Sequence, residues 1–215
     1  RLATDELNSA VRAALDCGAD RIVARDCHHG GGNVFEDELI QDPRVRYVQK
    51  IEPWNPLPGI DESFAGLILL GHHAKAGTLD SFLPHTMNGP WADFRINGRS
   101  VGEIGIESCI AGHFGAAPIL AQGDEALCAE ARAMWPAIAT AAVKRATTSD
   151  RCEGLSAEEG RKLTAERIAQ AIQSLRDGAA PPPYRPSLPM MAELELRSSE
   201  EARRIAANRP LARLC

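Results

Sequence analysis

The sequence lacks the features that mark several large classes of protein. No apolar run approaches the ~18 residues of a membrane-spanning helix, and no signal peptide precedes the first predicted helix. The 24 lysines and arginines form no basic stripe, and the formal net charge is −5. We therefore expect neither a membrane nor a nucleic acid among the partners of this protein.

The cysteines are placed so that two common uses of cysteine are excluded. The six cysteines, at positions 17, 27, 109, 128, 152 and 215, are widely spaced and form no Cys-x-x-Cys pair. This spacing argues against a disulfide framework and against a thiolate zinc site. We accordingly predict a reducing, cytoplasmic location.

Familiar nucleophile and phosphate motifs are also missing. There is no Gly-x-Ser-x-Gly, so a serine hydrolase of the elbow type is not expected. Gly71 and Gly77 are not followed by Lys-Ser or Lys-Thr at Walker spacing, which argues against a phosphate-binding loop. A Cys27–His28 nucleophile pair is disfavoured, because adjacent residues of an extended chain point to opposite faces.

What the sequence does have is histidine in a suggestive arrangement. Four of the six histidines form two pairs, 28–29 and 72–73, and each pair follows a run typical of a buried strand, at 21–25 and 66–70. In an open parallel sheet, the loops after the strands share one edge, where ligands bind. Imidazole is the commonest metal ligand and a general base near neutral pH. The pattern indicates a metal-dependent hydrolase.

Within each pair, one histidine is expected to face the site. Asp26 and His28 would share one face of an extended chain, and a carboxylate beside a metal-bound imidazole commonly fixes its tautomer. We prefer His28 to His29, because a glycine run follows His29. Between His72 and His73 the residues alone leave the choice open.

Two further residues complete the candidate site. His85 lies in a loop without apolar periodicity, and it could be a third ligand, a proton-transfer group or a surface histidine. Glu103 falls at the start of a predicted helix, where the helix dipole favours a carboxylate in any case. Two histidines and one carboxylate are nonetheless a familiar zinc ligand set.

Strands and helices alternate along the chain, which predicts an α/β fold of three layers with a mainly parallel central sheet. Thr4 is a plausible N-cap for the first helix, Asn97-Gly98 is typical of a type I′ hairpin turn, and Ser156 to Glu159 form a capping box. We expect the strands at 21–25, 66–70 and 118–121 to be parallel neighbours in one sheet. Further elements are expected at 45–48 (strand), 51–60 (connector), 102–114 and 124–135 (helices), 137–144 and 192–197 (extended), and in the last fifteen residues (helix).

The domain organisation is expected to follow the prolines. Residues 1–177 should form an α/β metal-binding catalytic domain, and residues 178–189 contain five prolines and should be a linker. Residues 190–215 would then be part of a small C-terminal domain. The chain begins at Arg1 in a helix, which suggests that a first strand is missing.

Taken in order, the motifs resemble the zinc-dependent D-aminopeptidase family, of the DppA type. The resemblance covers nearly the whole chain. It is carried by residues 25–28 (Arg-Asp-Cys-His), 69–76 (Leu-Leu-Gly-His-His-Ala-Lys-Ala), 85–87 (His-Thr-Met) and 96–105 (Ile-Asn-Gly-Arg-Ser-Val-Gly-Glu-Ile-Gly).

The resemblance implies a function and a role for each site residue. The metal ligands of the family fall on His28, His73 and Glu103, and the catalytic histidine falls on His85. It also implies two zinc ions per full-length subunit and two-metal activation of water. The implied substrates are short peptides with N-terminal D-amino acids, of the D-Ala type, and the implied assembly is a homo-oligomeric ring.

The sequence departs from the family at both ends. The family begins with a strand that ends in a metal-binding Asp-x-Glu pair, and this chain starts after that point; its C-terminal region is also shorter. We therefore expect a chain truncated at both ends. Two alternatives stay open, another metal-dependent amidohydrolase or a non-catalytic α/β binding module.

Overall fold

The computed structural model describes residues 1–49 and 56–207, apart from the side chain of His29. Within these ranges, none of the helices combines the length and the apolar character that crossing a membrane requires. The first part of the predicted connector at 51–60 lies outside the described residues, and its remainder forms turns.

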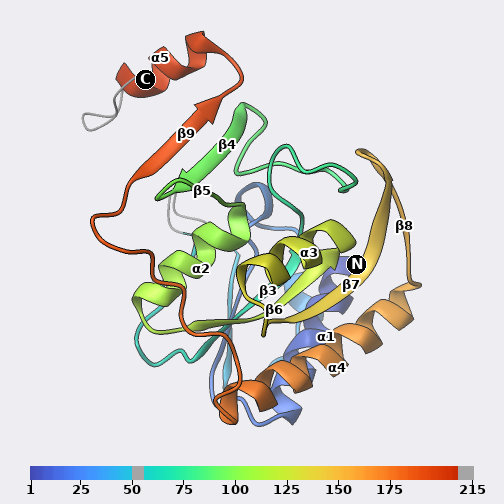
Figure 1. The fold of residues 1–215 in the computed structure, drawn as a ribbon. Helices are drawn as coiled ribbons and strands as arrows, with labels where there is room; N and C mark the ends of the chain where they lie inside the picture. Colours follow the sequence, from blue (N-terminus) through green and yellow to red (C-terminus); the bar gives the residue numbers. More distant parts are fainter. Residues whose placement is uncertain (50–55, 208–215) are drawn as a thin grey trace.

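A four-stranded sheet in the order β3-β6-β7-β8 forms the centre of the fold (Figure 1). Its strands are β3 (Gly66–His72), β6 (Ala117–Asp124), β7 (Ala139–Thr148) and β8 (Arg151–Gly154). The first three are parallel, and β8 is antiparallel to β7. Every residue of β6 is buried, because strands flank it on both sides and helices cover the sheet. The predicted mixed α/β fold with a mainly parallel sheet is confirmed.

Helices lie on both faces of this sheet. One face carries α1 (Leu2–Asp16) and α4 (Ala157–Arg176), and the other carries α2 (Glu103–His113) and α3 (Glu125–Met134). Each face has its own apolar cluster. The first includes Ala14, Ile119 and Ile168, and the second includes Leu69, Ile104 and Leu127.

The first two strands form a separate sheet. β1 (Ile22–Arg25) and β2 (Val45–Val48) pair in parallel with each other. The prediction that three strands are neighbours in one sheet is therefore right for β3 and β6 and wrong for β1. A groove of about 600 Å³ is lined by residues of both strands, among them Ile22 and Val23 of β1 and Leu67 and Ile68 of β3. β1 and β3 therefore border the same groove without being neighbours in one sheet.

The third sheet contains the predicted hairpin. β4 (Trp91–Ile96) pairs antiparallel with both β5 (Arg99–Ser100) and β9 (Ala192–Leu196). Asn97 and Gly98 have φ angles of 51° and 77°, the positive values that a type I′ turn requires. α5 (Ser199–Ala207) follows β9.

The proline-rich segment before β9 has no helix or strand, but it contacts the body of the fold. Tyr184 packs edge-on against Trp135, and Arg185 Nε donates a hydrogen bond to the carbonyl of Gly112 at 2.6 Å. These contacts attach the segment to the face that carries α2 and α3. The division into a catalytic domain, a linker and a C-terminal domain stays a prediction.

The two predicted helix caps have different outcomes. Ser156 and Glu159 form the predicted capping box of α4. The prediction for Thr4 is wrong, because α1 begins at Leu2 and Thr4 lies buried within it. The Thr4 hydroxyl instead accepts a hydrogen bond from Phe35 N at 3.0 Å and so holds a neighbouring loop.

Candidate metal centre

Strand β3 carries the second histidine pair to the edge of the central sheet. His72 is the last residue of β3 and is buried, and His73 follows it, half-buried. The side chain of Gln122 on β6 fixes this strand end, because its Oε1 accepts a hydrogen bond from Gly71 N at 2.7 Å. Adjacent residues of an extended chain point in different directions, so each histidine meets different partners.

His85 lies in the loop between β3 and β4, and two buried side chains attach this loop to the core. The Asp124 carboxylate accepts a hydrogen bond from Phe82 N at 2.7 Å. Thr86 Oγ1 accepts one from Ala76 N at 3.1 Å. The backbone on both sides of His85 is therefore held in place by the ends of β6 and β3.

Glu103 is the first residue of α2, where its negative charge interacts favourably with the helix dipole. Its Oε1 accepts a hydrogen bond from Met87 N at 2.8 Å. The start of α2 is thereby tied to the loop that carries His85.

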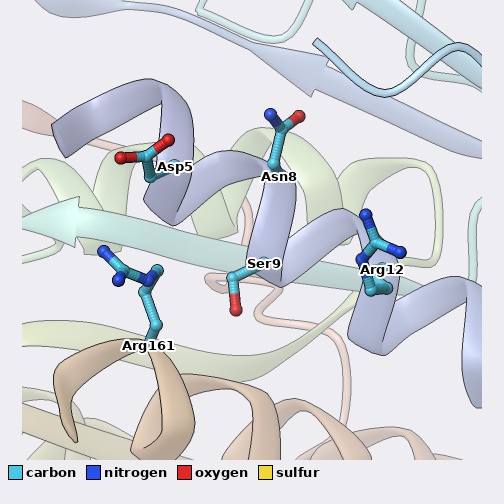
Figure 2. A pocket seen from close by; sticks show the side chains of 5 residues that line it. All are labelled: Asp5, Asn8, Ser9, Arg12 and Arg161. Carbon is cyan, nitrogen blue, oxygen red and sulfur yellow. The ribbon is translucent and has the colours of Figure 1, made fainter. Parts of the chain in front are cut away.

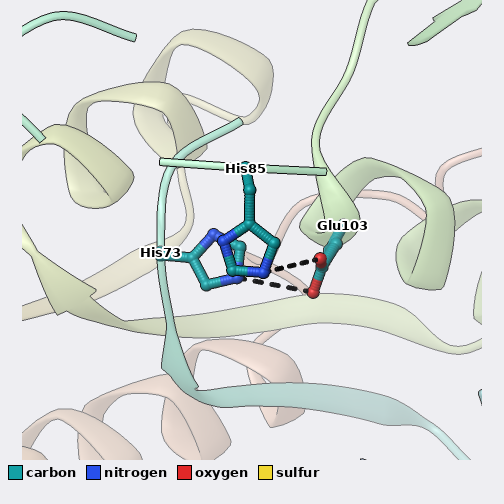
Figure 3. Close-up of side chains that lie close together, drawn as sticks. All are labelled: His73, His85 and Glu103. Carbon is teal, nitrogen blue, oxygen red and sulfur yellow. Dashed lines mark ion pairs between the residues drawn. The ribbon is translucent and has the colours of Figure 1, made fainter. Parts of the chain in front are cut away.

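The side chains of His73, His85 and Glu103 meet at this point (Figure 3). His73 Nε2 lies 3.7 Å from Glu103 Oε2, and His85 Nε2 lies 3.8 Å from Oε1. One candidate ligand atom from each residue lies within 4.8 Å of the others. The structure thus brings together three of the four predicted site residues.

The hydrogen bonds of the two imidazoles indicate which ring nitrogens are available. His73 Nδ1 lies 3.1 Å from the carbonyl of Ala74, and His85 Nδ1 lies 2.9 Å from that of Leu83. Since a carbonyl oxygen only accepts, each neutral ring carries its hydrogen on Nδ1 and a lone pair on Nε2. Both lone pairs are directed at the Glu103 carboxylate, which is also an acceptor. An imidazole nitrogen and a carboxylate oxygen are donor types that zinc takes, and a second imidazole beside them can serve either as a further ligand or as a proton acceptor.

Burial supports metal binding by His73. Desolvation lowers the pKa of His73, and the nearby Glu103 carboxylate opposes this shift. A lowered pKa favours the neutral imidazole, which is the form that binds metal ions.

A second group of potential ligands shares Glu103 with the first. His72 Nε2 lies 3.5 Å from Glu107 Oε2, and both residues are buried. Ligand atoms of His72, Glu103 and Glu107 lie within 4.8 Å of one another. Desolvation raises the pKa of Glu107, His72 opposes this shift, and Glu103 adds to it.

Sequence reasoning left His72 open as an alternative and missed Glu107. The spacing of Glu103 and Glu107 could have indicated that Glu107 belongs to the site, because residues four apart in a helix share one face of α2.

His28 lies outside both groups. It begins a short 3₁₀ turn, His28–Gly30, and is exposed. The Asp26 carboxylate, which was expected to orient the imidazole, accepts hydrogen bonds from His28 N at 3.2 Å and Asn33 N at 2.6 Å. Asp26 therefore shapes the loop backbone, and a metal role for His28 stays a prediction.

Cys27, two residues after β1, lies close enough to Glu103 and Glu107 for their carboxylates to affect the pKa of its thiol. Although part of Cys27 is exposed, desolvation raises its pKa to about 11, with further contributions from the carboxylates of Glu107 and Glu103. Such a thiol stays protonated at neutral pH and is a poor nucleophile. This agrees with the rejection of a Cys27–His28 nucleophile pair.

A further hollow lies away from these groups, between α1 and α4 (Figure 2). It measures about 430 Å³ and is lined by five polar or charged residues, Asp5, Asn8, Ser9, Arg12 and Arg161. It contains none of the histidines or glutamates described above. The metal centre is thus identified by its ligand chemistry rather than by a cavity.

The fold and the site define an α/β protein with a histidine–glutamate metal centre at the edge of its parallel sheet. The model of the peptidase M55 family, described as D-aminopeptidase, matches residues 1–214. The chain belongs to this family of metallopeptidases, and it is therefore a hydrolase.

The chain is similar to a known D-aminopeptidase in sequence and to a solved structure in fold. Its sequence is 30% identical over 188 residues to a D-aminopeptidase of Bacillus subtilis (strain 168). The aligned region covers 86% of this chain and 67% of that protein. A solved structure, described as the Zn-dependent D-aminopeptidase DppA from Bacillus subtilis, a self-compartmentalizing protease, superposes with a TM-score of 0.92. It covers 100% of this chain and 76% of the other at 26% identity.

Proposed function

We propose that this protein is a zinc-dependent aminopeptidase that hydrolyses short peptides with N-terminal D-amino acids of the D-Ala type. The observation that carries the proposal is the group of His73, His85 and Glu103 at the sheet edge of a member of this family. The zinc dependence of the structurally similar protein supports the choice of metal.

Two zinc ions per full-length subunit are proposed, with His73, Glu103 and His28 among the ligands. Zinc bound here would supply a Lewis acid that polarises the peptide carbonyl and lowers the pKa of water. The ligand chemistry and burial of His73 and Glu103 support their assignment. His28 follows β1, whose end faces the site, and it requires a direct test.

His85 is proposed to transfer the proton. Its Nδ1 is engaged by the carbonyl of Leu83, so Nε2 is left to accept a proton from the attacking water and to deliver it to the departing amine. The hydrogen bond from Met87 N to Glu103 Oε1 holds the Glu103 carboxylate beside His85 Nε2.

We also propose that the protein assembles into a homo-oligomeric ring in the cytoplasm. The self-compartmentalizing character of the similar protein supports the assembly, and the wide spacing of the cysteines supports the location. Light scattering coupled to size-exclusion chromatography would give the mass of the assembly, and a monodisperse monomer would contradict the ring.

The substrate proposal is tested with matched dipeptides. Zinc-loaded protein should release the N-terminal residue of D-Ala-D-Ala faster than that of L-Ala-L-Ala, and a chelator should abolish the activity. Preference for the L-peptide, or hydrolysis only of other amides, would favour a different metal-dependent amidohydrolase.

A further inference from the structure

A glutamate outside both histidine–glutamate groups joins the two segments that carry the proposed zinc ligands. Glu130 lies on α3, and its side chain is half-buried. Its Oε2 accepts a hydrogen bond at 2.8 Å from Lys75 N, two residues after His73. Its Oε1 lies against Gly102, the residue before Glu103, where an added Cβ would be only 2.7 Å away. One carboxylate therefore contacts both segments.

We propose that Glu130 is a positioning residue, which sets the separation of His73 and Glu103 by holding the backbone beside each of them. The inference rests on the proposed function and deepens it, because it assigns the residue that brings the two zinc ligands together. Glu130 acts through Lys75 N and Gly102 and is not itself a ligand.

The two segments pack directly against each other at this point. A Cβ on Gly102 would also lie 2.9 Å from Lys75 Cβ and 3.2 Å from Lys75 Cα, so this close approach requires a glycine. A second link joins the same segments, since Lys75 Nζ donates a hydrogen bond to Ser100 Oγ at 2.5 Å. The amide and the side chain of Lys75 are thus held separately, the first by Glu130 and the second by Ser100.

The start of α2 receives its negative charge from a neighbouring helix as well as from Glu103. Gly102 is the N-cap of α2 and makes no side-chain cap hydrogen bond. A carboxylate near a helix N-terminus is favourable, and Glu130 supplies one from α3. The Glu130 carboxylate therefore stabilises the turn that carries Glu103.

The burial of this carboxylate has a cost that its backbone contacts offset. Desolvation raises the pKa of Glu130, and the N–H and ammonium groups of Lys75 and the N–H of Gly102 oppose the shift. A carboxylate removed from water costs free energy unless hydrogen bonds compensate for the lost hydration. An apolar side chain at this position of α3 would avoid the cost, but it would leave Lys75 N without this acceptor.

The test compares the zinc affinity of variants of the intact protein, measured by competition between metal-free protein and a chelator of known affinity. Glu130→Ala should bind zinc about 10–100-fold more weakly than the wild type, the usual effect of losing a residue that orients a metal ligand. Glu130→Gln keeps the side-chain shape and one acceptor oxygen for Lys75 N. Its affinity should lie between those of the wild type and Glu130→Ala.

Two control variants separate positioning from overall stability. Glu166→Ala removes an exposed glutamate from inside α4. Ile168→Val opens a small cavity in the apolar cluster on the opposite face of the sheet from α3 and lowers the urea midpoint. Both controls should bind zinc as tightly as the wild type.

Wild-type zinc affinity in either Glu130 variant, with folding verified by circular dichroism, would overturn the inference. An equal loss of affinity in Ile168→Val would also overturn it, because zinc binding would then follow overall stability. The proposed function fails separately. The expected order of zinc affinities without hydrolysis of D-Ala-D-Ala would contradict the peptidase proposal and leave the role of Glu130 intact.

Discussion

The imidazole rings of His73 and His85 stack, with their centroids 3.8 Å apart and their planes inclined by 19°. A hydrogen bond from Ala76 N to Thr86 Oγ1 joins the two ends of the loop between His73 and His85. The Nε2 atoms of both rings face the carboxylate of Glu103. This relationship places the proposed metal ligand and the proposed proton-transfer group side by side.

Replacing His85 with alanine should separate these two roles. We expect kcat on D-Ala-D-Ala to fall by about 10²–10⁴, the usual effect of a positioned proton-transfer group. Zinc content, measured by mass spectrometry, should hardly change. Loss of zinc together with activity would make His85 a ligand, and an unchanged kcat would remove it from the mechanism.

Asp124 should be important for stability, because one buried carboxylate serves two elements. It accepts hydrogen bonds from Leu127 N at the start of α3 and from Phe82 N in the loop of His85. We expect Asp124→Ala to lower the free energy of unfolding by about 2–4 kcal/mol, through the lost cap and the unpaired buried donors. Urea denaturation measures this change. The exposed Asp150→Ala is the control and should change the stability by less than about 0.5 kcal/mol.

Gly123 should tolerate no side chain. A Cβ at this position would lie 2.1 Å from the carbonyl oxygen of His72 on the neighbouring strand. Gly123→Ala should therefore lower the free energy of unfolding by about 1–3 kcal/mol and displace the end of β3. Gly89→Ala is the matched control, since nothing lies within 4 Å of its added Cβ. Equal melting temperatures for the two variants would contradict the close approach of β3 and β6.

The capping box of α4 predicts one pH dependence of stability. Hydrogen bonds from the Ser156 side chain and backbone lower the pKa of Glu159 below its ordinary value of 4.5. The stability it contributes is present above pH 4.5 and is lost as the pH falls through the folded-state pKa. Glu159→Gln should thus lower the urea midpoint at about pH 7 and much less at about pH 3. The same difference at both pH values would mean that the charge of Glu159 is not involved.

Much of the fold followed from local patterns. The hairpin at Asn97-Gly98 and the start of α4 at Ser156 are specified by turn and cap chemistry, which few other structures satisfy. The separation of β1 from β3 could not be predicted, because a strand's apolar character does not identify its neighbour. Thr4 was misplaced because its partner, Phe35, is distant in sequence.

The candidate site, like the fold, was predicted in part. The expected convergence was of His28, His73 and Glu103. The structure brings His73 and Glu103 together with His85, at the edge where a strand end and a helix start meet. Glu107 was missed because a glutamate inside a helix is usually exposed to solvent. Its burial depends on the packing of α2 against β3 and β6, which the sequence does not state.

Anomalous diffraction at the zinc absorption edge shows whether His73 and Glu103 bind zinc. Crystals of the zinc-loaded protein should show an anomalous peak at about 2.0–2.2 Å from His73 Nε2 and from an oxygen of Glu103. The same experiment on Glu103→Gln should show the peak weakened or lost. Zinc bound elsewhere in the wild type, with no peak between His73 and Glu103, would show that these two residues are not zinc ligands.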